Sequence, residues 1–178
     1  MNSSVEATMN YWEVPSYQST SAYDGGVFHD SVYAPSQYNI MEILIKVMER
    51  PNPKVQLGPV DMSCPILVCD LQLADQPIVY ASEPFYQLTG YTPEEVIGSN
   101  CRFLQAPGGK VKAKSTRKYV DKECVRKMRK AVEKCSELQI EVVNFKKNGS
   151  KFVNYLTMIP VRCDGRDYCV GFLTELES

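Results

Sequence analysis

The first periodic pattern along the chain is helical. Asn39 stands before it as a suitable N-cap, and Pro51 follows it as a helix breaker. Between them, apolar side chains recur three or four positions apart at Ile40, Ile43, Leu44, Val47 and Met48. The spacing predicts an amphipathic helix over 39–50. Its apolar face must be buried, either on the protein's own sheet or on a partner that can replace the sheet.

The later patterns predict strands. Residues 64–70 and 78–80 are short apolar runs of the kind found in buried strands. Two further runs, 138–147 and 151–160, flank an Asn-Gly dipeptide, which is a strong hairpin signal. A last run at 168–176 follows an Asp-Gly turn. The order is therefore two strands, an intervening region, and three strands.

The intervening region carries helix signals. Ser82 is a candidate N-cap for a helix that Gly90 ends, and the Thr92–Glu95 segment has the form of a capping box. Residues 106–119 are expected to form a loop, after which Asp121 begins another helix. The apolar face predicted for that helix consists of Val125, Met128, Val132 and Cys135.

Length and composition favour one domain with an appendage in a chain of 178 residues. Residues 1–36 are rich in Ser, Tyr, Asn, Gly and Pro without periodicity, which predicts a flexible tail or a latch lying on the core. We place an N-terminal cap at 37–63, with the helix and a short extended segment. The core is then expected over 64–178.

Charge is unevenly distributed. The formal net charge is -1, which by itself indicates neither direct nucleic-acid binding nor a membrane surface. Residues 110–130, however, hold ten of the 20 basic residues and only two acidic ones. Such a block is either a solvated face or a site for a bound phosphate.

The seven cysteines are odd in number and form no Cys-x-x-Cys pair. Together with an N-terminus unlike a signal peptide, this predicts free thiols in a reducing compartment. No stretch approaches the ~20 apolar residues of a membrane helix. His29 is the single histidine, so zinc sites and Ser-His-Asp catalysis lack parts, and we expect neither a metal nor a turnover enzyme.

One stretch carries the most specific signal. Residues 98–105 read Gly-Ser-Asn-Cys-Arg-Phe-Leu-Gln. All eight positions resemble the signature of the LOV (light-oxygen-voltage) family, the blue-light-sensing branch of PAS domains. The resemblance covers about 58 to the end, and it reaches further in the Vivid-type fungal photoreceptors. With those, 40–53, 114–121 and 142–149 also match.

The resemblance implies an α+β PAS/LOV fold, with a five-stranded antiparallel sheet and helices on one face. It also implies that Cys101 is the photoreactive thiol. In this family blue light excites a bound flavin, the cysteine sulfur adds to flavin carbon C4a while N5 gains a proton, and the bond breaks again in darkness. The cofactor supplies the difficult chemistry and the protein supplies position.

A flavin site needs apolar walls and a few fixed amides, and Asn144 and Asn154 are the candidate amides. A two-residue Asn-Gly turn would pair Asn144 with Val153 and send Asn154 to the other face of the sheet. For both amides to share a face, we expect a turn centred on Gly149, hence a three-residue loop or a bulge. Leu156 and Met158 would then line the same face.

Other site residues follow from the resemblance. Arg102 and Arg129 resemble the family's phosphate-binding arginines, a role that suits the bidentate guanidinium. Asn100 and Gln105 are expected to hold the ribityl chain and phosphate. The remaining candidate walls of the flavin site are Leu67, Ile78, Leu104 and Leu173. The loop at 106–118 resembles an insertion that accommodates an adenine, which implies FAD, with FMN as the alternative.

One position departs from the family pattern. LOV domains usually carry Gln on the last strand, where its amide responds to N5 protonation, and here Leu173 occupies that place. Leucine cannot exchange hydrogen bonds, so weaker coupling is expected without loss of the adduct. Water, Asn154 or Cys169 are alternative relays, and Cys64 and Cys69 lie near the expected hinge between cap and core.

The function we predict is a flavin-binding blue-light photoreceptor. Adduct formation would rearrange the cap and drive a light-dependent homodimer or binding to a white-collar-type LOV/PAS transcription factor in photoadaptation, in the cytoplasm and nucleus. Three alternatives stay open. They are a light-insensitive PAS interaction module, a flavin-dependent redox enzyme, and a thiol redox sensor using Cys64, Cys124 or Cys135.

Overall fold

The computed structural model describes residues 38–61 and 63–177, so the predicted tail at 1–36 lies outside the described residues. The helices are α1 (Ile40–Met48), α2 (Glu83–Thr89), α3 (Pro93–Val96), the 3₁₀ turn η1 (Cys101–Gln105) and α4 (Lys122–Glu133). The strands are β1 (Ile66–Asp70), β2 (Ile78–Ala81), β3 (Leu138–Phe145), β4 (Lys151–Cys163) and β5 (Arg166–Phe172). The order of elements is the one that the sequence predicted.

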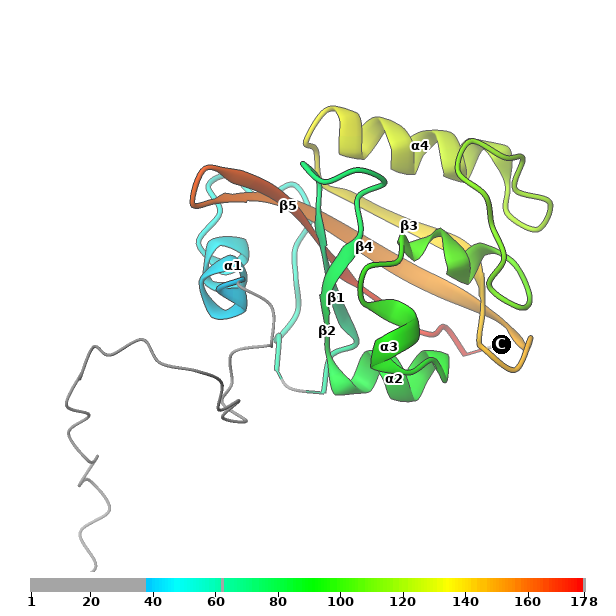
Figure 1. Cartoon of the computed structure of the whole chain (residues 1–178). Helices are drawn as coiled ribbons and strands as arrows, with labels where there is room; N and C mark the ends of the chain where they lie inside the picture. The colour runs from blue at the N-terminus through cyan, green and yellow to red at the C-terminus, as the bar shows by residue number, and fades with distance from the viewer. Residues whose placement is uncertain (1–37, 62, 178) are drawn as a thin grey trace, which may run out of the picture.

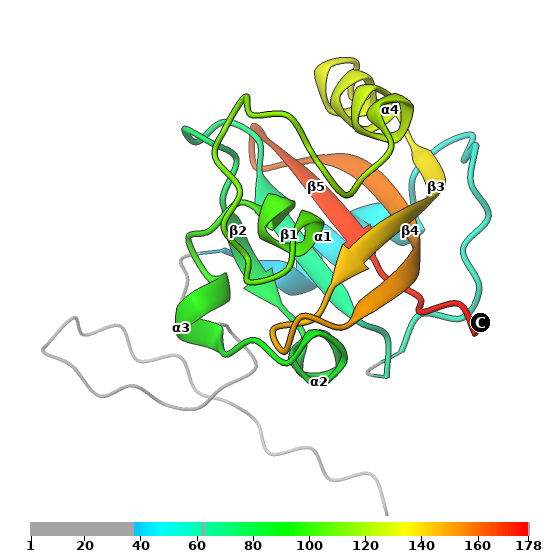
Figure 2. The same ribbon diagram turned by 90° about the vertical axis from the view of Figure 1, so that its right-hand side faces the viewer.

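The five strands form one antiparallel sheet in the order β2-β1-β5-β4-β3. Figure 1 shows α2, α3 and α4 on one side of this sheet and α1 on the other, and Figure 2 shows the same separation after a quarter turn. We call the side of α2, α3, η1 and α4 the inner face and the side of α1 the outer face. The predicted fold class, a five-stranded sheet with helices on one face and a separate N-terminal helix, is confirmed.

Strand β1 supplies both faces of the sheet. Ile66 and Val68 belong to the cluster on the outer face, whereas Leu67 and Cys69 belong to the cluster on the inner face. Because successive strand residues point to opposite sides, a strand covered on both sides is apolar without alternation. This explains why all five residues of β1 are buried.

Helix α1 begins as predicted, with the Asn39 side chain accepting a hydrogen bond from the Glu42 N–H at 3.1 Å. Ile43 and Val47 are each only 1% exposed and pack on the outer face of the sheet. The helix is therefore buried on the protein's own sheet. The prediction that Met48 belongs to the buried face is wrong, because its side chain is 57% exposed. It lies with Met41 and Ile45, 56% and 45% exposed, on a side of the helix that the sheet does not cover.

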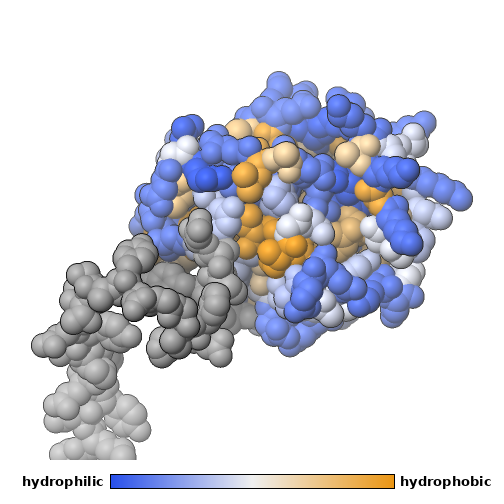
Figure 3. All heavy atoms as spheres, in the orientation of Figure 1, coloured by the Kyte–Doolittle hydropathy of each residue, from blue (hydrophilic) through white to orange (hydrophobic). Residues whose placement is uncertain are grey.

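Further apolar side chains reach the surface. Leu57 and Val60, after α1, are half-buried against the outer-face cluster, and so is Tyr80 of β2. In the view of Figure 3, apolar side chains gather near the middle of the molecule, with hydrophilic ones around most of the rim. The cap is thus a thin cover over the sheet rather than a second core.

The last two strands depart from the predicted bounds. Strand β4 continues past 160 to Cys163 because it stays paired with β5 up to the Asp164-Gly165 turn. Strand β5 ends at Phe172 rather than 176. Beyond it the Leu173 N–H donates to the Pro65 carbonyl at 3.0 Å, and only an isolated bridge between Asn154 and Glu175 continues the ladder.

Helix α4 has the predicted cap, since the Asp121 carboxylate accepts hydrogen bonds from the N–H groups of Glu123 and Cys124. The prediction that Cys135 belongs to its apolar face is wrong. The helix ends at Glu133, Cys135 has a positive φ of 45° that no helix residue adopts, and its side chain is exposed. The backbone turn that redirects the chain into β3 decides this.

Candidate functional site

A cavity lies between the inner face of the sheet and the helices that cover it. The space between the atoms that line it, with the open solvent at its mouth included, amounts to about 750 Å³. The predicted site residues that line it are Leu67, Asn100, Cys101, Leu104, Gln105, Asn144, Asn154, Leu156, Met158 and Leu173. Ten positions spread over the chain from 67 to 173 thus meet in one place.

The thiol of Cys101 reaches the cavity from the first residue of η1. Gly98, at a φ of 83°, lets the chain turn sharply before it. The Gly98 N–H donates to the Ile78 carbonyl at 2.8 Å, and the Ile78 N–H returns the bond to Ser99 at 2.8 Å, so the turn is fastened to β2. The thiol is therefore held by backbone contacts rather than by a mobile loop.

Asn100 fixes the same turn from its other side. Its Oδ1 accepts from the Arg102 N–H at 3.0 Å and so caps η1, while its Nδ2 donates to the carbonyls of Asp75 and Gln76. Asn100 thus ties the 3₁₀ turn to the β1–β2 loop. In this arrangement it orients the neighbouring Cys101 as well as lining the cavity.

Two further thiols, which the sequence analysis did not place in the site, also line the cavity. Cys69 of β1 lies directly opposite Cys169 of β5 in the sheet. A hydrogen bond with the Cys69 thiol, aided by the Arg102 charge, lowers the pKa of Cys101 against the effect of burial. The same contact raises the pKa of Cys69, and burial raises that of Cys169 to about 12. The three thiols thus lie close together around one cavity.

The two amides share the inner face, as the predicted site requires. Asn154 and Asn144 are 1% and 4% exposed, and the Asn154 Nδ2 donates to the Asn144 Oδ1 at 2.9 Å. The predicted centre of the turn is wrong by one residue. Asn144 pairs with Phe152 and Val142 with Asn154, so the hairpin is centred on Asn148 and not on Gly149.

The hairpin loop explains that register. The Lys146 N–H donates to Ser150 at 2.9 Å, which leaves a three-residue loop of the predicted length. The Gly149 N–H also donates to Lys146 at 2.9 Å, and Gly149 has a φ of 86°, the pattern of a turn followed by a bulge residue. The loop length was therefore predicted correctly, and the shift of one residue came from the place of the glycine within it.

Gly171 keeps the floor of the cavity open. A Cβ built there would lie 3.2 Å from the Leu67 side chain and 3.9 Å from that of Leu156. An added methyl would therefore push the Leu67 side chain toward the cavity, whereas its contact with Leu156 would be an ordinary one. Leu173, two residues on, is 2% exposed and also faces the cavity, so no amide stands at this end of β5.

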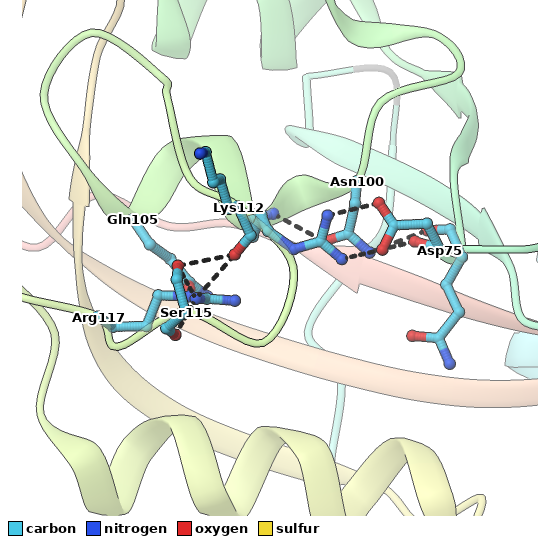
Figure 4. A network of polar contacts seen from close by, with 8 residues as sticks. Asp75, Asn100, Gln105, Lys112, Ser115 and Arg117 are labelled. Carbon is cyan, nitrogen blue, oxygen red and sulfur yellow. Dashed lines mark hydrogen bonds and ion pairs between the residues drawn. The ribbon is translucent and has the colours of Figure 1, made fainter.

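A second, wider hollow opens at the mouth of the cavity and is basic. Arg102, Arg117 and Arg129 all line it, together with Gln105, which lines both spaces. Figure 4 shows Arg117 against Gln105, and the Arg117 Nε donates to the Gln105 Oε1 at 2.8 Å. The Arg102 guanidinium makes a bidentate ion pair with Asp75. Partial burial and the two other arginines lower the pKa of Arg117.

One predicted wall residue lies elsewhere. Ile78 is fully buried, but it does not line the cavity and instead packs with Phe85 and Val96 in the inner-face cluster. An apolar strand residue next to a site cannot be told from one that lines it by sequence alone. The cavity residues that the sequence patterns did not indicate are Cys69, Leu71, Gln76, Met128, Cys169 and Gly171, and at the mouth Arg117.

The donor set fits a flavin. The walls are apolar, two buried amides stand side by side where a pyrimidine edge could exchange hydrogen bonds, and three guanidinium groups at the mouth suit phosphate.

The expectation that no metal is needed stays a prediction. In the described residues, Glu42, Cys163 and Asp164 bring ligand atoms within 4.8 Å of one another, but they lie at the outer face, away from the cavity.

Comparison with protein families agrees with this site. A family profile described as a PAS domain matches residues 63–177. Among curated proteins, the chain is 44% identical over 148 residues to the blue light receptor lreA of Aspergillus flavus, covering 82% of this chain and 17% of that protein. It is 41% identical over 162 residues to the white collar 1 protein of Neurospora crassa, covering 90% and 14%. The chain spans less than a fifth of the length of these curated relatives.

Solved structures of fungal photoreceptors are similar in both sequence and fold. The light-state dimer of the fungal blue-light photoreceptor Vivid is 57% identical, with a TM-score of 0.76, covering 82% of this chain and 99% of that one. A fungal LOV-domain photoreceptor described as integrating blue light and oxidative stress is 42% identical, with a TM-score of 0.70, covering 83% and 98%. Both likenesses extend beyond the core into the cap.

Proposed function

We propose, from the premise that this chain belongs to the PAS domain family and to its LOV subclass, that it is a blue-light photoreceptor in which Cys101 forms a reversible bond to a flavin. The observation that carries the proposal is the meeting of the Cys101 thiol and the Asn144–Asn154 amide pair in one apolar cavity. A bound flavin absorbs blue light and supplies an electrophilic carbon, C4a, to a nearby sulfur.

The residues of this chain supply position for that step. The fastening of Gly98 and Asn100 holds the Cys101 sulfur at the cavity, which favours addition by proximity rather than by a general base. Asn144 and Asn154 would orient the ring through its polar edge. The Cys101 thiol would supply both the sulfur and the proton to a bound flavin and would recover the proton when the bond breaks, so the site would return to its starting state without turning over a substrate.

We propose FAD as the flavin, with FMN as the alternative. Arg102 and Arg129 are candidates for the first phosphate, and Arg117 adds a third cation at the mouth, beside Gln105. Arg117→Gln is therefore expected to weaken FAD by roughly tenfold, since a charge-assisted hydrogen bond contributes ~1.5–3 kcal/mol. The affinity for FMN should fall less. Titration of the apoprotein with each flavin, followed by fluorescence quenching, measures the two dissociation constants. An equal loss of affinity for FAD and FMN would show that Arg117 does not contact the adenine-nucleotide part of FAD.

The output proposed for the adduct is a rearrangement of the cap over 37–63. Helix α1 covers the outer face and already exposes Met41, Ile45 and Met48. Movement of the cap would expose the side chains that α1 now buries, Ile40, Ile43 and Val47, and so enlarge this apolar surface. A larger apolar surface suits a light-dependent homodimer. It also suits a partner LOV/PAS transcription factor of the white-collar type, in photoadaptation. The described residues include no helix with the length and apolar composition of a membrane span. As a separate proposal, by analogy with a transcriptional partner, we place the protein in the cytoplasm and nucleus.

One absorption measurement tests the core of the proposal. Purified protein should be yellow, lose its blue absorption band on illumination and regain it in darkness, whereas Cys101→Ala should bind flavin without bleaching. Colourless protein that fails to take up added flavin would favour a PAS interaction module instead. Sustained oxidation of NAD(P)H would favour a flavin-dependent redox enzyme.

Size-exclusion chromatography in darkness and in light tests whether the protein forms a light-dependent dimer. An unchanged elution volume would contradict the proposed rearrangement of the cap.

A further inference from the structure

A single carboxylate, that of Glu137, fastens the segment of the cap just after α1 to the core. Its Oε1 accepts from the Arg50 Nε at 2.8 Å, and its Oε2 accepts from the backbone N–H groups of Lys54 and Val55 at 2.8 and 2.7 Å. The three donors all belong to the segment that follows α1. Figures 1 and 2 both show this segment running beside the start of β3.

Arg50 completes the connection on the cap side. Besides Glu137, its guanidinium donates to the carbonyls of Val47 and Val55, each at 2.6 Å. Val47 lies in the last turn of α1, so one side chain joins the end of the helix, the loop after it and the core. Loss of the Arg50–Glu137 contact would therefore detach both the end of α1 and the loop after it from this point of the core.

This ion pair differs from the others in the described residues. The side chains of Arg50 and Glu137 are 11% and 12% exposed, whereas every other described pair has at least one side chain that is 40% exposed or more. A pair shielded from water is coupled strongly, and removal of one partner leaves the other as an uncompensated charge. Exposed pairs contribute little. Removal of either partner should therefore be felt more strongly here than at the exposed pairs.

Glu137 also stands at a joint between two walls of the cavity. It lies between α4, whose Met128 lines the cavity, and β3, whose Val142 and Asn144 line it. The Ser136 N–H donates to Ala131 at 2.9 Å, which fixes the joint to the end of α4. A shift of either wall when the cavity changes its contents would move the Glu137 carboxylate relative to its three donors.

We infer that the Arg50–Glu137 pair is a positioning pair that holds the cap closed in darkness and releases it when the α4–β3 joint moves. This rests on the proposed function, because it gives the route by which the state of Cys101 reaches the cap. The route passes through the joint rather than through the side chain at 173. Leu173 offers no amide to rearrange, and its backbone N–H is already bonded to Pro65.

The first arm of the test is run in darkness and needs no photochemistry. Hydrogen exchange followed by mass spectrometry reports the protection of a peptide that contains residues 51–56. In Glu137→Gln this peptide should exchange at least tenfold faster than in the wild type, with core peptides unchanged. Glu123→Gln is the matched control, since it removes a carboxylate from the exposed Glu123–Arg126 pair of α4, 49% and 63% exposed, and should change nothing. Unchanged protection in Glu137→Gln would overturn the inference.

The second arm compares light with darkness in the same protein. In the wild type, illumination that bleaches the flavin should raise exchange of the 51–56 peptide at least fivefold, with recovery in step with the absorption band. Glu137→Gln should bleach normally but show no further increase. A residue with a purely structural role would leave the light-minus-dark difference intact. Bleaching without any change at 51–56 in the wild type overturns the inference alone, whereas failure to bleach overturns the proposed function while the dark result still stands.

Discussion

The two faces of the sheet are made by the same strands and differ in what they leave unfilled. On the outer face, Val68, Ile159 and Val170 are fully buried beneath α1, and the cluster is closed. On the inner face, the neighbouring residues Cys69 and Cys169, with Gly171, surround a cavity. One strand therefore supplies stability through its even positions and a binding site through its odd ones, and a shift of one residue would exchange the two.

The largest expected effect comes from a substitution on the inner face, which should remove the photochemistry and leave the stability supplied by the outer face. Cys101→Ala should abolish reversible bleaching completely, because no other residue supplies the sulfur held at η1. Unfolding temperature should stay close to that of the wild type, since the small side chain is only half-buried. Absorption spectra in dark and light, with circular dichroism on the same sample, make the measurement. Residual bleaching in this variant would point to Cys69 or Cys169 as the reactive thiol.

The next effect is on the outer face. Ile159→Ala removes a fully buried side chain and should lower the free energy of unfolding by about 2–5 kcal/mol, through lost burial and an unfilled space. At a temperature where it is still folded, bleaching should be normal. Chemical denaturation gives the first quantity and illumination the second. Ile159→Val, which should cost only about 0.5–1.5 kcal/mol, is the graded control.

A smaller effect is expected from Gly171→Ala, which closes the cavity from below. The added methyl would lie 3.2 Å from the Leu67 side chain, so that side chain must shift into the cavity proposed to hold the flavin ring. Flavin affinity should fall severalfold and the dark recovery rate should change, with little loss of stability. Titration of the apoprotein with flavin tests this. An affinity equal to that of the wild type would show that Leu67 can move aside without narrowing the cavity.

The smallest effect concerns pH and the cap. Burial opposes ionisation of Glu137, but the hydrogen bonds from the Val55 N–H, Arg50 and the Lys54 N–H outweigh it and lower its pKa below the usual 4.5. A carboxyl whose folded pKa is depressed stabilises fully above its unfolded pKa, and the contribution is lost as the pH falls through the folded pKa. The stability difference between wild type and Glu137→Gln should thus be constant near neutrality and shrink below about pH 4.5. A difference that grows on acidification would contradict the assignment.

Several parts of this molecule could be predicted because they depend on local chemistry. Asn39 and Asp121 cap their helices as expected, since an N-cap needs only its own side chain and the next turn. The eight-residue stretch ending at Gln105 placed Cys101 on a helical turn at the cavity. The requirement that Asn144 and Asn154 share a face also led to the correct loop length.

Other parts depended on contacts between distant segments. Ile78 was expected in the site and lies behind it, because its neighbours Phe85 and Val96 come from helices whose packing no periodicity specifies. Cys69 and Cys169 meet only because β1 and β5 are adjacent, although 99 residues separate the two in the chain. Arg117 belongs to a loop without periodicity, and its approach to Gln105 had no signal in the sequence.

The sequence by itself determined the order of the elements, the family signature and the candidate for the reactive thiol, because these rest on short-range spacing and on residue type. The tertiary structure alone decided which face each strand residue occupies, how the three thiols and three arginines assemble, and that Glu137 meets Arg50. The physical reason is that burial and ion pairing depend on the surroundings of a group. Those surroundings are set by sheet order and chain turns, which bring together residues far apart in the chain.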